Sequence, residues 1–99
     1  MDFQQRAFDW LSRRYASLHH FDLESYSLAF MRVYQEVGSP SSFPVVKQAV
    51  FRVLDDSVVV DYVDSVREPL VSGARTMDMY RELFAHDYWM LGMDLRQGF

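Results

Sequence analysis

The chain has 99 residues and a formal net charge of −4, from 14 acidic and 10 basic side chains. Apolar residues make up 49% and aromatic residues 16%, which excludes a disordered or low-complexity chain and suits one domain, residues 1–99, with a buried core. The sequence contains no cysteine, which excludes disulfides, thiolate metal sites and cysteine nucleophiles.

Apolar residues recur mostly at spacings of three and four, which is the period of a helix. The first such run predicts a helix from Asp2 to about His19. A second helix is expected to follow, with Asp22 as its N-cap and Gly38 as its stop signal. Two helices therefore account for the start of the chain up to the first glycine.

The segment 38–44 is a connector that is too short to separate two domains. Pro44 fits the first turn of a third helix, because its fixed backbone angle suits that position and its missing N–H is not needed there. Ser41 or Ser42 would supply the N-cap. The apolar residues of this helix cover a broad face, which predicts a position near the centre of the packing: Val45, Val46, Ala49, Val50, Val53 and Leu54.

Residues 57–68 fit two structures. The consecutive valines at 58–60 favour a strand by propensity. In a helix, the segment would place Val59, Tyr62 and Val66 on one face and acidic residues on the opposite face. We expect a helix that ends before Pro69, and we keep the strand as the alternative.

A last helix is expected from a cap at Thr76 to about Leu91, with Gly92 as its stop. The chain would then contain five helices joined by short loops. This pattern predicts an all-α fold, a compact bundle around one core.

The sequence lacks the short motifs of common catalytic and nucleotide-binding sites: it has no glycine-rich dinucleotide loop, no P-loop, no H-E-x-x-H and no G-x-S-x-G. His19 and His20 are adjacent, so on a helix they would point about 100° apart and would not readily share a metal ion. His86 has no partner at ligand spacing in its own helix. We therefore expect no enzyme activity, no cofactor and no metal site.

Two charged residues interrupt the apolar faces of their helices. Asp87 falls in the middle of the apolar face of the last helix, and Arg14 falls beside Trp10 on that of the first. A lone buried charge costs several kcal/mol, so each residue should find a partner or reach the rim of the core. We expect the two to meet, or each of them to bond a tyrosine hydroxyl.

Asp61, Asp64 and Glu68 would lie along one side of the predicted helix at 57–68, and we call these three residues the acidic ridge. Residues 51–99 hold nine acids and five bases, which accounts for the whole net charge. The simplest interpretation of the acidic ridge is a solvated face. The functional interpretation is a surface that attracts a basic partner protein, including one that normally binds nucleic acid.

Three apolar residues lie off the main apolar faces. Leu28 and Met31 are on the second helix, and Trp89 is on the side of the last helix that also carries Asp78 and Glu82. Exposed tryptophan and adaptable methionine are typical of partner-binding surfaces, although a small bundle can also bury residues on several sides of a helix. Leu28, Met31 and Trp89 are therefore candidates for contact with a partner protein.

A helix-turn-helix that binds DNA is the alternative function. Gly38 lies in a turn between two helices, and Lys47, Gln48 and Arg52 share one side of the later helix, where they could reach base edges. The connector is longer than the usual turn, and the acidic pair 55–56 that follows would repel phosphate. Direct binding to nucleic acid is therefore disfavoured.

In size, acidity and helicity alone, the chain resembles the broad class of small microbial proteins that act by binding another protein, such as inhibitors, anti-activators, immunity proteins and phage-encoded blockers. The resemblance implies a non-enzymatic protein that regulates or inhibits a partner protein, either as a monomer or as a homodimer. The sequence has neither the basic start and apolar run of a signal peptide nor a stretch long enough to span a membrane, so we expect a cytoplasmic location.

Overall fold

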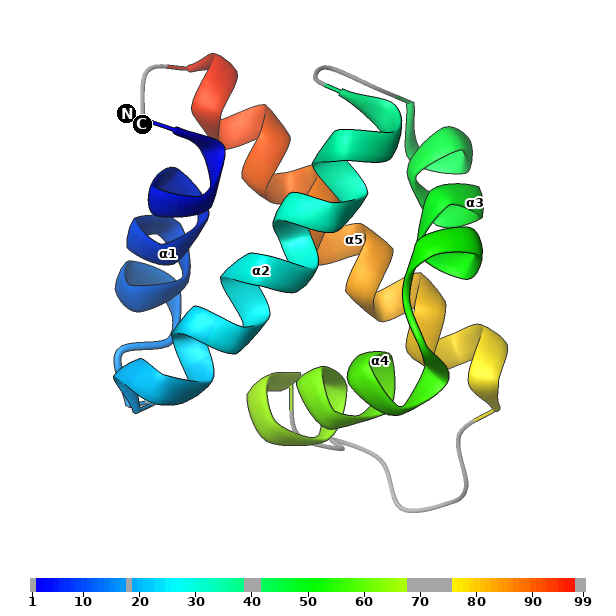
Figure 1. Ribbon diagram of the computed structural model, residues 1–99, viewed down its shortest axis with the longest axis horizontal. Helices are drawn as coiled ribbons and strands as arrows, with labels where there is room; N and C mark the ends of the chain where they lie inside the picture. The colour runs from blue at the N-terminus through cyan, green and yellow to red at the C-terminus, as the bar shows by residue number, and fades with distance from the viewer. Residues whose placement is uncertain (1, 18, 39–41, 68–75, 98–99) are drawn as a thin grey trace.

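The computed structural model describes residues 2–17, 19–38, 42–67 and 76–97 (Figure 1). These residues form helices and contain no strand, which confirms the all-α prediction and excludes the strand alternative as far as Arg67. The elements are α1 (Phe3–Arg14), α2 (His20–Val37), α3 (Phe43–Val53), α4 (Asp56–Tyr62), the short π-helix η1 (Val63–Arg67) and α5 (Met77–Arg96).

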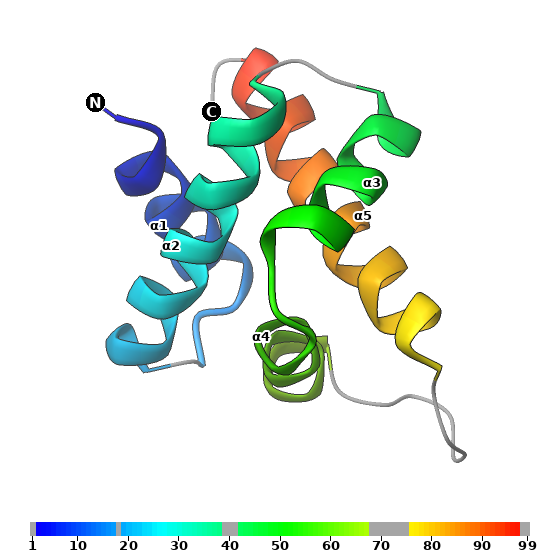
Figure 2. The same ribbon diagram turned by 45° about the vertical axis from the view of Figure 1, so that its right-hand side comes forward.

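The helices surround one core. α2 crosses the middle of the molecule between α1 and α3, while α5 runs behind it and α4 closes one end (Figure 1). The main contacts join α1 to α2, α2 to α3, α3 to α5 and α4 to α5. Figure 2 shows the same arrangement as two neighbouring pairs, α1 with α2 and α3 with α5, above α4.

Aromatic rings fill the centre of this core. Phe30 of α2 is completely buried, and its ring lies 5.0 Å from that of Phe84 and 5.5 Å from that of Tyr62. The rings of Trp10 and Tyr88 approach Phe30 from α1 and α5. One residue of α2 therefore contacts aromatic side chains from α1, α4 and α5, and such aromatic pairs each add about 0.5–1.5 kcal/mol beyond the burial of their area.

Side chains cap the first and the last helix. The Oδ1 atom of Asp2 accepts a hydrogen bond of 2.8 Å from the backbone N–H of Gln5, and Thr76 accepts one of 3.2 Å from Met79. The cap predicted at Thr76 is confirmed. At the start of α3, Ser42 occupies the N-cap position without a side-chain bond, and Pro44 lies in the first turn as predicted.

Gly38 ends α2, as the sequence predicts. Its backbone has φ 67° and ψ −161°, a combination that L-residues with a Cβ rarely adopt. Its N–H donates to the carbonyl oxygen of Tyr34 at 2.7 Å, which closes the last turn of the helix. The chain therefore turns out of α2 at the residue best suited to do so.

Three predicted helix ends differ from the structure. α1 ends at Arg14 rather than near His19, because the backbone of Tyr15 leaves the helical region. α2 begins at His20, so Asp22 lies inside its first turn rather than at the cap. The predicted stop at Gly92 is wrong: α5 continues through this glycine to Arg96, and a Cβ placed there would meet no neighbouring atom. Among the described residues, no helix is both long enough and apolar enough to cross a membrane.

Candidate functional site

A buried carboxylate lies between α1, α4 and α5. Asp87 is 0% exposed, and its Oδ2 atom accepts hydrogen bonds of 2.7 Å from the hydroxyls of both Tyr15 and Tyr62. Tyr62 is itself completely buried, and burial together with the negative charge of Asp87 raises the pKa of its hydroxyl well above 10. The pair of tyrosine donors satisfies the carboxylate inside the core.

Arg14 reaches this cluster from its rim. The guanidinium is exposed, and its Nε–H donates to the hydroxyl oxygen of Tyr15 at 3.1 Å. The Cζ atom of the guanidinium also lies 5.0 Å from the centre of the Trp10 ring, within the range of a cation–π interaction. Of the two charged residues predicted to interrupt the core, Asp87 is buried and Arg14 is not, and Tyr15 joins them.

Other aspartates also accept hydrogen bonds from aromatic donors rather than from cations. The indole Nε1–H of Trp10 donates to Asp94 at 2.6 Å, which ties α1 to the last turns of α5. Tyrosine hydroxyls donate to Asp61 at 3.2 Å and to Asp64 at 3.1 Å. Part of the acidic excess in residues 51–99 therefore serves as acceptors that hold neighbouring helices together.

The acidic ridge does not form one free line of carboxylates within the described residues. Asp61 and Asp64 are both exposed, but Asp61 accepts from Tyr26 of α2, whereas Asp64 accepts from Tyr80 of α5. The π-helical segment η1 begins between them and changes the spacing of side chains along the helix. Glu68, the third member of the acidic ridge, lies outside the described residues.

Trp89 belongs to a small aromatic group at the surface, which we call the aromatic cluster. Its ring centre lies 6.1 Å from that of Phe43 at the start of α3 and 6.5 Å from that of His86, one turn earlier on α5. Trp89 and Phe43 are partly buried, whereas His86 is exposed. The predicted partner-binding residue Trp89 thus packs against two aromatic neighbours.

Charged residues border the aromatic cluster. Lys47, one turn after Phe43, lies 3.5 Å from Asp78 and 3.4 Å from Glu82, both on α5. Partly buried aromatic residues with a polar border are the usual anatomy of protein interfaces.

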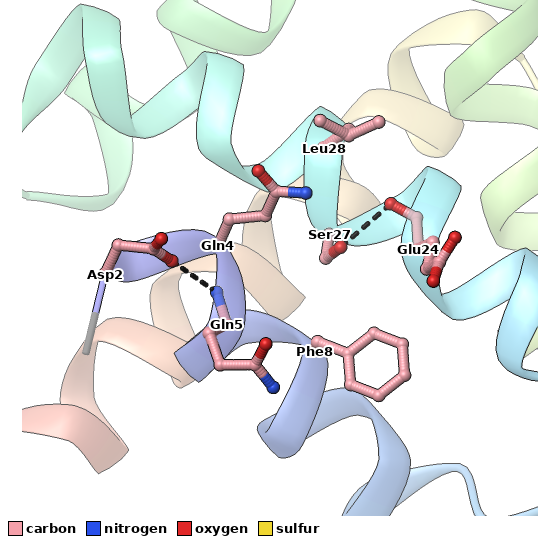
Figure 3. A pocket seen from close by; sticks show the side chains of 7 residues that line it. All are labelled: Asp2, Gln4, Gln5, Phe8, Glu24, Ser27 and Leu28. Atoms are coloured by element: carbon pink, nitrogen blue, oxygen red, sulfur yellow. Dashed lines mark hydrogen bonds between the residues drawn. The ribbon is translucent and has the colours of Figure 1, made fainter.

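Leu28 and Met31 lie elsewhere, on α2. Leu28 is 51% exposed, the largest exposed fraction among the large apolar residues that the structure describes, while Met31 is partly buried. A groove of about 340 Å³ is lined by residues of α1 and α2, including Gln4, Phe8 and Leu28. In the view of Figure 3, Leu28 lies nearer to Gln4 than to Phe8, which lies at the other side of the groove. The predicted partner-binding residues that the structure describes lie on three parts of the fold: Leu28 and Met31 on α2, Asp61 and Asp64 on α4 and η1, and Trp89 on α5.

The helix face considered for DNA binding carries little free positive charge. Lys47 is paired with the carboxylates of α5, and Arg52 donates two hydrogen bonds of 3.0 and 3.2 Å to Glu36. Phe51 of the same helix has the guanidinium of Arg81 4.0 Å from its ring centre and is 42% exposed. These ion pairs neutralise the cations that phosphate contacts require.

No group of three metal-ligating side chains occurs among the residues that the structure describes. His19 and His86 are both exposed, and they lie on different helices or helix ends. Catalytic and cofactor-binding roles were not predicted for any residue, and nothing in the described geometry assigns one.

Sequence reasoning missed two contributors to these surfaces. Phe43 was not singled out, because its partners Trp89 and His86 are more than forty residues away along the chain. Phe8 lies within the first predicted helix, and it also lines the groove beside Leu28. The apolar character of both residues was visible in the sequence, but their neighbours follow from the packing of helices.

Comparison with protein families, with curated proteins and with solved structures finds no match for this chain. The class that the structure defines is a small all-α domain with a buried aspartate–tyrosine cluster and two partly apolar surfaces.

Proposed function

We propose that this chain is a non-enzymatic protein that binds another protein and regulates or inhibits it, with the aromatic cluster of Phe43, His86 and Trp89 as the contact surface. The observation that carries the proposal is the position of Trp89, which remains partly exposed although it packs against Phe43 and His86. Tryptophan dominates the binding energy of many interfaces, because it contributes a large apolar area while few torsions have to be ordered.

The surroundings of Trp89 support this role. Two aromatic neighbours hold its ring, so little side-chain freedom remains to be lost when a partner binds. The ion pairs of Lys47 with Asp78 and Glu82 border the cluster and leave a polar edge that water can reach. Such an arrangement favours a rigid anchor for a protein partner.

The buried aspartate supports a structural rather than a catalytic role. The Oδ2 atom of Asp87 is occupied by two tyrosine hydroxyls, and the side chain has no exposed area through which a substrate could reach it. A general acid or base must come within hydrogen-bond reach of the group that it protonates or deprotonates. Asp87 therefore favours the non-enzymatic part of the proposal.

The negative charge of the chain bears on the partner. The net charge is −4, and Asp61 and Asp64 remain exposed while they accept tyrosine hydroxyls. Because charge acts over about 10 Å at moderate salt, these residues can attract a basic protein without touching it. We propose a basic partner, whose approach is steered by the acidic side of the molecule and whose contact is made at Trp89.

The first test measures capture of the partner from extracts of the source organism by the tagged chain, quantified by mass spectrometry. We expect Trp89→Ala to reduce the captured amount of one protein by about thirtyfold, the effect of losing a residue that dominates binding, and His86→Ala to reduce it less. Val45→Ala is the matched control, since Val45 is 45% exposed and two residues from Phe43, on another side of α3. Equal capture by both variants and by the unchanged chain would contradict the proposal.

A second measurement separates this function from binding to DNA. We expect the chain to pass through a heparin column at low salt without retention and to give no gel shift with duplex DNA, because Lys47 and Arg52 are already paired with carboxylates. A DNA-binding protein would be retained and would lose affinity steeply as salt rises. Retention that depends on Lys47 and Arg52 would favour the helix-turn-helix alternative.

A further inference from the structure

We infer that the outer face of α2 binds a second copy of this chain, with the two α2 helices packed antiparallel around Leu28. The inference goes beyond the proposed function, because it concerns a surface that shares no residue with the aromatic cluster. It rests on the exposure of Leu28 and on the charges one helical turn to either side of it.

Glu24, Leu28 and Arg32 form one row along α2. They are spaced by four residues, so they lie on the same side of the helix, about 40° apart around its axis. All three are exposed, and Leu28, at 51%, is the most exposed of the large apolar residues that the structure describes. Among the described residues, neither the Glu24 carboxylate nor the Arg32 guanidinium forms a hydrogen bond or an ion pair.

The charges of this row are complementary to those of the same row running in the opposite direction. In a two-fold, antiparallel pair of helices, residues equally far before and after the centre face each other. With Leu28 at the centre, Glu24 of each copy faces Arg32 of the other, which gives one ion pair on either side of the leucine contact. A parallel pair would instead bring Glu24 to Glu24 and Arg32 to Arg32, so the charges select the antiparallel arrangement.

Grooves on both sides of the row can receive side chains of the second copy. On the α1 side, the groove of about 340 Å³ is lined by Gln4, Phe8 and Glu24 among others (Figure 3). On the α3 side, a second groove of about 320 Å³ is lined by Arg32, Gln35, Glu36, Arg52 and Val53. The row is thus a ridge between two hollows, and packing of helix ridges into neighbouring grooves is the common mode of helix association.

The charges of the row also favour a second copy over a partner that carries charges of only one sign. A uniformly basic segment would gain from Glu24 but would be repelled by Arg32, eight residues later on the same face. A reversed copy of the same helix satisfies both charges. An interface built on one helix and its borders is at the small end of specific interfaces, so we expect the dimer to dissociate on dilution.

Sedimentation velocity over a range of protein concentrations tests the inference. We expect the unchanged chain to shift from monomer to dimer as its concentration rises, and Leu28→Asp to remain monomeric throughout. Met79→Asp is the matched control, because Met79 is 48% exposed but lies on α5, and it should dimerise like the unchanged chain. Circular dichroism and urea unfolding establish that each variant is folded.

Charge reversal gives the decisive result. Glu24→Arg and Arg32→Glu should each weaken dimerisation by about tenfold or more, because each places like charges opposite one another. The double variant E24R/R32E should restore dimerisation, since both ion pairs form again with the acidic and basic positions exchanged. A monomeric unchanged chain, or a double variant no better than either single one, would overturn the inference. Capture of the partner through Trp89 is measured separately, with Leu28→Asp as the tested chain, so failure of one proposal leaves the other standing.

Discussion

Replacing Asp87 with alanine is expected to destabilise the fold by about 3–6 kcal/mol, because two hydrogen bonds to a charged acceptor are lost and each contributes about 1.5–3 kcal/mol. The hydroxyl of Tyr62 would lose its acceptor inside the core, and that of Tyr15 would lose its acceptor beside Arg14. Because a domain of this size is usually stable by about 5–15 kcal/mol, the variant should lose a large share of its stability. Urea unfolding followed by circular dichroism measures the change.

Asp87→Asn refines this expectation. The asparagine has nearly the same shape and can accept from a tyrosine, but hydrogen bonds to a neutral acceptor contribute less than those to a charged one. A loss of about 1–3 kcal/mol at neutral pH is expected. Asp94→Asn is the control, because Asp94 is partly exposed and accepts a single bond, from Trp10, so its loss should be smaller. Unchanged stability in Asp87→Asn would show that the cluster is not a determinant of folding.

A variant that removes the whole cluster of Asp87, Tyr15 and Tyr62 also tests its contribution to the stability of the fold. Replacing Asp87 by leucine together with Tyr15→Phe and Tyr62→Phe removes the acceptor together with its two tyrosine donors, so neither hydroxyl is left without this acceptor. Apolar replacement of a complete buried polar group is often neutral or stabilising, whereas removal of one member is not. We expect the triple variant to be more stable than Asp87→Ala, and the opposite order would contradict the assigned hydrogen bonds.

The second large effect is a loss of stability at alkaline pH. The pKa of Tyr62 is raised well above 10, mainly by burial and then by the charge of Asp87, so the folded protein keeps this hydroxyl protonated where the unfolded chain loses its proton. Above about pH 10 the unfolded state therefore binds fewer protons, and the free energy of unfolding falls as pH rises, by up to about 1.4 kcal/mol per pH unit for this residue. Burial also raises the pKa of Tyr88, which adds to the slope.

Tyr62→Phe provides the measurement. At neutral pH the variant should be less stable by about 1.5–3 kcal/mol, because one hydrogen bond to the Asp87 carboxylate is lost. Phenylalanine does not titrate, so the difference between the variant and the unchanged chain should shrink above about pH 10. Urea midpoints measured between neutral and strongly alkaline pH follow both proteins. Parallel pH curves for the two chains would contradict the raised pKa of Tyr62.

The helical content could be predicted because it depends on local patterns. The apolar spacing in α2 and the stop at Gly38 report on the backbone of the same segment, and the structure confirms both. The valine run at 58–60 was ambiguous because its propensity and its amphipathic pattern disagree. Tertiary packing decides it: Val59 and Tyr62 are completely buried on the helical face that meets α5.

The ends of helices were predicted less well, since contacts from distant segments determine them. α1 ends where Tyr15 is held by its bond to Asp87, which is 72 residues away in the sequence. α5 passes Gly92 because Asp94 and Leu95 beyond it contact Trp10 and the core. A glycine costs a helix only about 1 kcal/mol, and these contacts exceed that cost.

In the candidate sites, too, single residues could be identified from the local sequence, whereas their contacts depend on distant segments. The sequence marked Asp87 and Arg14 as charges on apolar faces, but it could not show that Tyr15 joins them, because the match depends on how α1 and α5 cross. It marked Leu28 and Trp89 as misplaced apolar residues, and the structure places them on separate surfaces. The partner-binding roles of these residues remain predictions.

Tyr15 and Tyr62 share one carboxylate oxygen, so the polar character of three positions is coupled. Replacement of Asp87 alone takes this acceptor from two hydroxyls, whereas replacement of both tyrosines takes two donors from a buried carboxylate. Substitutions at positions 15, 62 and 87 should therefore be tolerated more readily as a group than one at a time.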